Sequence, residues 1–289
     1  MSNPGMVIEE RSRDIGDFLV GRLLPFRKKR MVGPFIFIDH MGPSVIKEGS
    51  YMDIDPHPHI GLSTLTYLFK GEILHRDSIG SNQIVKSGDV NLMTAGSGVS
   101  HTERTPTEIR DGLERELHGY QVWIALPKEK EEMPPEFHHT ESSKLPEWVE
   151  NQLSYKLVTG KISDYESPVP TYSPQYMLEI KALESTSLDL SPFFGETGVV
   201  LVNGSLKACG ENIQAGNMLI AKHEDGCSVQ LEKGSHIMVF GGEPFAEERH
   251  IYWNFVATEK RRIEKAKERW ANRQFPQVVG DSGYIPLPS

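Results

Sequence analysis

Hydrophobic positions along this chain come in short runs that end at clusters of glycine, proline, asparagine or serine. Short apolar runs between turn-forming residues are typical of β-strands, whereas helices need longer stretches with a period of about 3.6 residues. In the first half we expect strands at residues 18–24, 35–39, 62–69, 73–77, 89–93 and 120–126. In the second half we expect them at residues 155–159, 176–180, 199–203, 218–221, 228–231 and 236–240. The pattern therefore predicts an all-β protein.

Two segments depart from the strand pattern. Residues 126–146 are rich in charge and proline, and we interpret them as a solvated connection that leaves the first β-domain. A short charged helix near the C-terminus is predicted to begin at Thr258, which would be its N-cap. The apolar stripe of this helix is Ile263, Ala266 and Trp270, which we expect to dock on the β-structure rather than on a partner.

Two triplets, His57-Pro58-His59 and His101-Thr102-Glu103, place metal-binding side chains two residues apart. Successive side chains of a strand point to opposite faces, so each pair would project from one face of its strand. Two such pairs facing each other across a small barrel would surround one ion. Three imidazoles and one carboxylate suit iron, manganese, nickel, copper or zinc better than calcium or magnesium.

The alternative is that these are ordinary histidines, since the chain has 11 of them and a chance His-x-His is unremarkable. The sequence before the second triplet favours metal binding. Residues 88–98 predict a turn, a short strand and a glycine-rich bend, which would deliver His101 and Glu103 to one place.

The two halves show a weak internal repeat. Residues 69–73 are similar to residues 202–206, and residues 86–90 to residues 214–218, so two turn glycines recur in the same order. We counted from these glycines without gaps to find the positions equivalent to His57, His59 and His101 in the second half. They are Leu190, Pro192 and Val229, none of which can bind a metal. The second half is therefore predicted to keep the β-domain and to lack the metal site.

Composition narrows the functional classes. The 289 residues suffice for one large or two ordinary domains, and the net charge of −9 argues against direct nucleic-acid binding. The two cysteines, Cys209 and Cys227, are too few for a disulfide framework and are expected to be buried free thiols. No apolar run approaches the roughly 20 residues of a membrane span, and the start has no signal-peptide core. We therefore expect a cytoplasmic protein without membrane contact.

Longer strings around these triplets resemble the pirin family of the cupin superfamily. They are GPFIFIDHMGP at 33–43, HPHIG at 57–61, MTAGSGVSHTE at 93–103, HGYQVW at 118–123 and GGEP at 241–244. Residues 61–64 hold no glutamate, where many cupins carry one soon after His-x-His, and in this pirin-like pattern the acidic ligand is Glu103.

The resemblance implies a bicupin fold, with two β-barrel (jelly-roll) domains. The first, residues 1–130, would hold the metal; the second, residues 131–289, would lack the ligands and include the C-terminal helix and tail. The resemblance also implies one divalent transition metal, Fe(II), bound by His57, His59, His101 and Glu103.

The resemblance further implies a quercetin 2,3-dioxygenase-like activity on a small aromatic substrate and dioxygen. Glu103 would then be a ligand and also the catalytic proton acceptor, since a carboxylate bound through one oxygen can use the other as a base. Three further histidines could line the mouth or orient a ligand, or could equally be ordinary structural or surface residues: His40, His75 and His118. Gln121 could contribute a polar handle. Trp123 could form an aromatic wall, although core packing is the simpler role.

The alternative belongs to another class of protein. The chain could be a non-enzymatic, iron-dependent regulatory protein that binds a protein partner, as the resemblance to eukaryotic pirins implies. The basic run at residues 27–30 is the feature that could support nuclear import, but it is more typical of a solvated rim. A cupin isomerase acting on a sugar phosphate would need a basic phosphate cradle, and residues 57–66 offer none.

Overall fold

The computed structural model describes residues 5–14, 19–110, 114–208, 210–221 and 228–288. These residues form strands β1–β25, three short 3-10 helices and one α-helix, α1 (Lys260–Ala271). They fold into two compact units. Unit 1 comprises Met1–Ser12, Gly21–His40 and Ser143–Pro244, and unit 2 comprises Arg13–Val20, Met41–Ser142 and Phe245–Ser289. The domain boundary after residue 130 stays a prediction.

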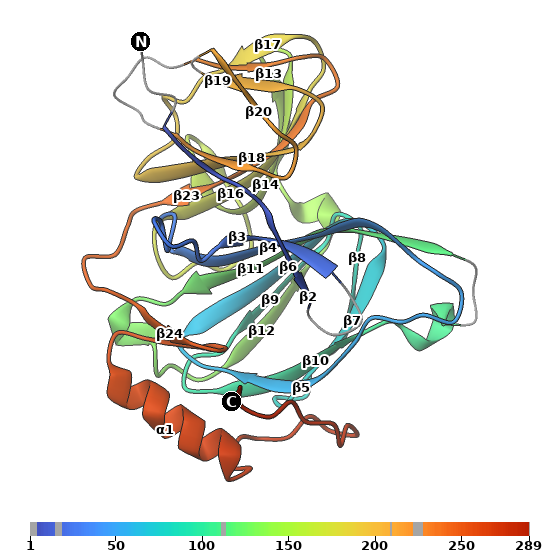
Figure 1. Ribbon diagram of the computed structural model, residues 1–289, viewed down its shortest axis with the longest axis vertical. Helices are drawn as coiled ribbons and strands as arrows, with labels where there is room; N and C mark the ends of the chain where they lie inside the picture. Colours follow the sequence, from blue (N-terminus) through green and yellow to red (C-terminus); the bar gives the residue numbers. More distant parts are fainter. Residues whose placement is uncertain (1–4, 15–18, 111–113, 209, 222–227, 289) are drawn as a thin grey trace. The chain divides into compact units, whose positions relative to one another are not determined.

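Unit 2 contains two antiparallel sheets (Figure 1). One has the order β5-β10-β7-β8, from β5 (Asp53–His59), β10 (Val99–Arg104), β7 (Glu72–Asp77) and β8 (Asn82–Lys86). The other includes, in the order β12-β9-β6-β11, strands β12 (Glu136–Thr140), β9 (Val90–Thr94), β6 (Leu62–Lys70) and β11 (Arg115–Ala125). A short hairpin, β24 (His250–Tyr252) with β25 (Phe255–Ala257), precedes α1.

Unit 1 repeats this plan. Its larger sheet has the order β1-β21-β18-β23-β16-β14-β13, built from β1 (Met6–Ile8), β21 (Met218–Ala221), β18 (Glu196–Asn203), β23 (His236–Gly242), β16 (Gln175–Ala182), β14 (Leu153–Ile162) and β13 (Glu147–Glu150), with β15 (Tyr165–Glu166) also on β14. Its smaller sheet has the order β17-β22-β19-β20, from β17 (Thr186–Leu188), β22 (Val229–Leu231), β19 (Leu206–Ala208) and β20 (Glu211–Ile213). Three strands contain residues of both units: β2 (Arg11–Asp14), β3 (Leu19–Leu24) and β4 (Phe35–Ile46).

The all-β prediction is confirmed, and each predicted strand overlaps an observed one. The sheets are not closed into barrels, but each unit contains a pair of sheets, which is consistent with the two predicted jelly-roll domains. Phe18, predicted to start a strand, lies outside the described residues, as do Cys209 and Cys227.

The internal repeat is visible in the turn geometry. Gly71 and Gly204 have φ of +87° and +89°, and Gly88 and Gly216 both have φ of +84°. The N–H groups of Gly88 and Gly216 each donate to the carbonyl of a strand leucine, at 2.7 Å in both cases. Such left-handed backbone favours glycine, which explains why these residues recur.

The ungapped count along the repeat was wrong by two residues. Val229 pairs with Ala208, and Glu103 pairs with His75, and each partner lies four residues after its repeat glycine. Val229 thus occupies the place of Glu103 rather than that of His101, because the connection that precedes β22 is two residues shorter. The described part of the smaller sheet in unit 1 is accordingly apolar at this position, with Val229 fully buried.

The prediction of a solvated connection at residues 126–146 was wrong in part. Strand β12 lies within it and pairs with β9, with Phe137 opposite Met93. Glu131, also in this segment, is buried and accepts hydrogen bonds from the backbone N–H of Thr258 at 2.8 Å and from its hydroxyl at 3.1 Å. A tertiary contact therefore buries the side chain of Glu131, which the sequence pattern predicts to be in solvent.

The same contact corrects the start of the helix. Helix α1 begins at Lys260 with Glu259 at the N-cap position, and no side chain caps it, because the hydroxyl of Thr258 is bonded to Glu131. The predicted apolar stripe is confirmed, since Ile263, Ala266 and Trp270 are buried in a cluster with Phe255 and Ile60. In the described residues, no helix is long and apolar enough to span a membrane.

Candidate metal centre

The two histidine triplets lie on neighbouring strands. Strands β5 and β10 pair antiparallel, with His57 directly opposite His101 and His59 opposite Val99. The strand conformation assumed for both triplets is confirmed, but the two pairs meet side by side within one sheet, not across a barrel. This arrangement turns the alternate side chains of both strands to one face.

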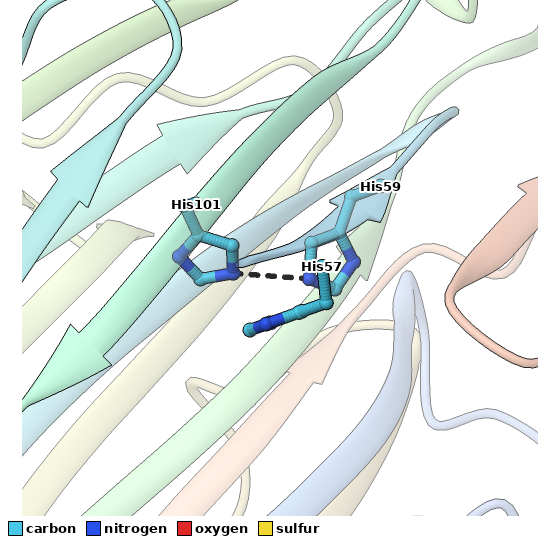
Figure 2. Close-up of side chains that lie close together, drawn as sticks. All are labelled: His57, His59 and His101. Atoms are coloured by element: carbon cyan, nitrogen blue, oxygen red, sulfur yellow. Dashed lines mark hydrogen bonds between the residues drawn. The ribbon is translucent and has the colours of Figure 1, made fainter. Parts of the chain in front are cut away.

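The three imidazoles converge on one point. One ring nitrogen from each of His57, His59 and His101 lies within 4.8 Å of the others, and the Nε2 atoms of His59 and His101 are 3.1 Å apart. Figure 2 shows the rings of His59 and His101 turned toward each other, with His57 beside them. Two nitrogens bound at about 2.1 Å and at right angles on a metal would be ~3.0 Å apart, so this spacing fits a shared ion.

The other ring nitrogens are directed away from this point. Nδ1 of His57 donates to the carbonyl of Asp55 at 2.9 Å, and Nδ1 of His101 lies 3.3 Å from Nδ1 of His75. Nδ1 of His59 has no partner at hydrogen-bond geometry among the described residues. The nearby backbone of Asn254 nevertheless raises the pKa of His59 in part, against the larger effect of burial. Bonds of this kind orient a metal-binding imidazole and leave its Nε2 available.

Burial keeps the imidazoles neutral, which is the form that binds metals. It lowers the pKa of His57 to about 4, against the favourable carbonyl of Asp55. Burial, followed by repulsion from neighbouring histidines, also holds the pKa values of His59 and His101 well below the usual range. A buried cluster of neutral imidazoles is suited to a cation and costs free energy when protonated.

Glu103 is buried beside this group but is not part of the set within 4.8 Å. Burial raises its pKa to about 7, although a hydrogen bond with Gln121 lowers it. The hydroxyl of Thr66 donates to Oε1 of Gln121 at 2.6 Å, so the Gln121 amide N–H₂ is left to donate to Glu103. The role of Glu103 as a fourth ligand stays a prediction.

The other candidates separate clearly. His75 contacts His101, whereas His40 is bonded to Glu10 at 2.9 Å within unit 1, and the ring of His118 packs on Phe69. The Trp123 ring meets that of His59 edge-on, with centroids 5.1 Å apart, which places an aromatic wall beside a candidate ligand.

Sequence reasoning missed Asp77, which accepts a hydrogen bond from His75. The signal was present, because His75-x-Asp77 has the same two-residue spacing as the two triplets and lies in a predicted strand. Among the described residues, one group of His, Cys, Asp or Glu side chains lies close enough together to hold a metal ion. It consists of His57, His59 and His101, all in unit 2.

Comparison with known proteins places both halves of the chain. Residues 18–124 match Pirin, and residues 176–276 match the Pirin C-terminal cupin domain. A pirin-like protein of Caulobacter vibrioides is 40% identical over 290 residues, covering 98% of this chain and 99% of its own.

Solved structures extend the likeness. A crystal structure of quercetin 2,3-dioxygenase from Acinetobacter baumannii matches with a TM-score of 0.89 and 34% identity, over 98% of this chain and 95% of that one. A bacterial pirin from Escherichia coli in complex with nickel(II) has the same fold, with a TM-score of 0.64 and 20% identity over 83% of this chain and 99% of that one.

Proposed function

This chain belongs to the pirin family and has two cupin domains, and on that premise we propose that it is an iron(II)-dependent dioxygenase of quercetin or a similar flat aromatic molecule. One observation carries the proposal. Three buried imidazoles converge on one point, and a buried carboxyl group, Glu103, follows two residues after one of them on the same strand. The similarity to the quercetin 2,3-dioxygenase of Acinetobacter baumannii supports the reaction class.

The donor set supports a transition metal. Three imidazole nitrogens favour iron, nickel, zinc and their neighbours over calcium or magnesium, and the Escherichia coli pirin holds nickel(II). Iron(II) bound by His57, His59 and His101 would supply open coordination positions and redox chemistry toward dioxygen.

The residues of the chain would prepare the substrate. Glu103 would accept the proton of a flavonol hydroxyl. Two observations support this role: Glu103 lies two residues after His101, and a hydrogen bond with Gln121 orients its carboxyl group. Trp123, packed against His59, makes the surroundings aromatic on one side, as a flat substrate requires. Burial of the histidines would keep bulk water from competing for the site.

The test is oxygen consumption by protein loaded with iron(II) under anaerobic conditions and then mixed with quercetin and oxygenated buffer. We expect uptake that is lost in His101→Ala and in the metal-free protein, and kept in His138→Gln. His138 is a matched control, because it is a half-exposed histidine paired with Glu136 on β12. Absence of uptake by protein with iron tightly bound would reject the dioxygenase and favour an iron-dependent regulatory protein that binds a partner.

Glu103→Gln separates two functions of one side chain. Loss of turnover with iron retained would assign Glu103 as the proton acceptor, and loss of both would assign it as a ligand. Unchanged turnover would exclude both assignments.

A further inference from the structure

Behind His101 lies a second pair of buried polar side chains, on strand β7. The register of β10 and β7 sets Asp77 opposite His101 and His75 opposite Glu103. Nδ1 of His75 lies 3.3 Å from Nδ1 of His101, and Nε2 of His75 lies 3.0 Å from Oδ2 of Asp77. His101, His75 and Asp77 are all at most 5% exposed, so water does not compete for these hydrogen bonds.

Asp77 is held in one orientation by the turn that follows β7. Its Oδ1 accepts the backbone N–H groups of Ile79 at 3.0 Å and Ser81 at 2.9 Å, which leaves Oδ2 facing His75. Burial alone would raise the pKa of Asp77, but the hydrogen bonds from His75 and Ser81 outweigh it and lower the pKa. Asp77 is therefore a carboxylate, which can only accept hydrogen bonds.

The proton positions follow from this end of the chain of hydrogen bonds. Because Asp77 is an acceptor, His75 donates from Nε2, and in a neutral imidazole that leaves Nδ1 as the acceptor. That Nδ1 accepts a hydrogen from Nδ1 of His101, so the proton of His101 lies on Nδ1. The Nε2 of His101, 3.1 Å from that of His59, then has its lone pair free.

The ring of His75 is also fixed sterically. It stacks on Phe137, with centroids 4.6 Å apart and planes 19° from parallel. Phe137 lies on β12, in the segment that the sequence pattern had placed in solvent. The ring thus has little freedom to turn away from His101.

We propose that His75 and Asp77 are positioning residues of the metal centre, which hold His101 in the tautomer whose Nε2 can bind a metal. The inference rests on the metal site proposed above and adds two residues to it. Among the three candidate ligands, His57 takes its orienting bond from a backbone carbonyl, whereas His101 depends on side chains. Such partners of a ligating histidine typically change metal affinity by about 10- to 100-fold.

Asp77→Asn is the sharpest variant, because it keeps the shape and reverses the hydrogen bond. The asparagine carbonyl would stay with the N–H groups of Ile79 and Ser81, so its NH₂ would face Nε2 of His75. His75 would then carry its proton on Nδ1, and His101 would be driven to carry its own on Nε2, where the metal binds. We expect the Ni²⁺ dissociation constant, measured by chelator competition, to rise about 10- to 100-fold.

A second variant tests whether Asp77 acts through His75. His75→Gln removes the connecting ring, so Asp77→Asn should have little further effect on Ni²⁺ affinity in that background. The ¹⁵N chemical shifts of His101 in the metal-free protein give an independent measurement, with the proton expected on Nδ1 in the wild type and on Nε2 in Asp77→Asn. His138→Gln is again the matched control and should bind Ni²⁺ as the wild type does.

The outcomes are distinct. If the wild type binds Ni²⁺ and Asp77→Asn binds it equally well, or if the two substitutions are simply additive, the positioning role is rejected. An unchanged His101 tautomer in a folded Asp77→Asn protein would reject it as well. If the wild type binds neither Ni²⁺ nor Fe²⁺, the metal site itself fails, while the tautomer measurement still decides whether Asp77 orients His101.

Discussion

At the scale of single residues, the candidate centre combines groups that burial pushes in opposite directions. Burial of His57 favours its neutral imidazole, and burial of Glu103 favours its neutral carboxylic acid. In the metal-free protein both groups should therefore be neutral between the two pKa values, about 4 and about 7, so His57 carries no positive charge that would repel a cation.

The pH dependence of stability tests the state of Glu103. The pKa of Glu103 is raised from 4.5 to about 7 on folding, so between these values the native protein binds the proton more strongly than the unfolded chain. Stability from this group is fully present below about pH 4.5 and is lost as the pH rises through 7.

Glu103→Gln is always neutral and escapes this loss. In the metal-free protein, its unfolding free energy should therefore rise relative to the wild type between pH 4.5 and 7, by on the order of 3 kcal/mol. Urea unfolding at a series of pH values measures the difference. A difference that does not change with pH would show that Glu103 titrates normally.

His57 should act in the other direction. Its pKa falls from 6.5 to about 4 on folding, so the unfolded chain binds more protons between these values and stability is lost as the pH falls. We expect metal-free His57→Asn to lose less stability than the wild type between pH 6.5 and 4, as measured by its thermal midpoint. An equal loss in both proteins would contradict the burial of a neutral His57.

At the scale of elements, the site depends on how β5 ends and β6 begins. Gly61 lies between them with φ of +68°, two residues after His59, and its N–H donates to the carbonyl of Gly96 at 2.9 Å. A Cβ at this position would lie 2.0 Å from the backbone oxygen of Val256. The close approach of two backbones thus fixes the end of the strand that carries two candidate ligands.

Gly61→Ala should lower both stability and metal affinity, because β5 must move to relieve the contact. Gly49→Ala is the matched control, since Gly49 also has positive φ, at +74°, but open space around its Cβ position. We expect a loss of about 1–2 kcal/mol from backbone strain alone in the control, and roughly 1–3 kcal/mol more in Gly61→Ala. Thermal melts and Ni²⁺ titrations measure the two effects, and equal behaviour of the two variants would exclude a role for the contact.

At the scale of the whole molecule, the two units share a strand order and turn glycines, but the candidate metal-binding side chains lie in unit 2. The turn glycines and the four-strand order recur, whereas Ala208 and Val229 occupy the places of His75 and Glu103. A domain can keep its hydrophobic core when apolar residues replace a binding site, because a stable core needs only apolar side chains of suitable volume.

We therefore expect one metal ion per chain after loading with Ni²⁺ or Fe²⁺ and removal of excess by gel filtration. His101→Ala should retain close to none while keeping its β-sheet circular dichroism spectrum. Metal analysis by mass spectrometry gives the ratio. A second ion that survives in His101→Ala would show that another part of the chain binds metal.

The alternation of side chains along a strand is a local property of the backbone, so the sequence alone determined the strand runs, the apolar stripe of α1 and the pairing of His57 with His59 on one face. The donor types, visible in the same few residues, indicated which class of metal such a group would favour. Only the tertiary structure decided that β5 and β10 are direct neighbours, that Asp77 and His75 lie behind His101, and that Glu131 takes Thr258 from the helix cap. These facts depend on which distant strands and side chains hydrogen-bond to each other, and such long-range partners leave no periodic trace in the sequence.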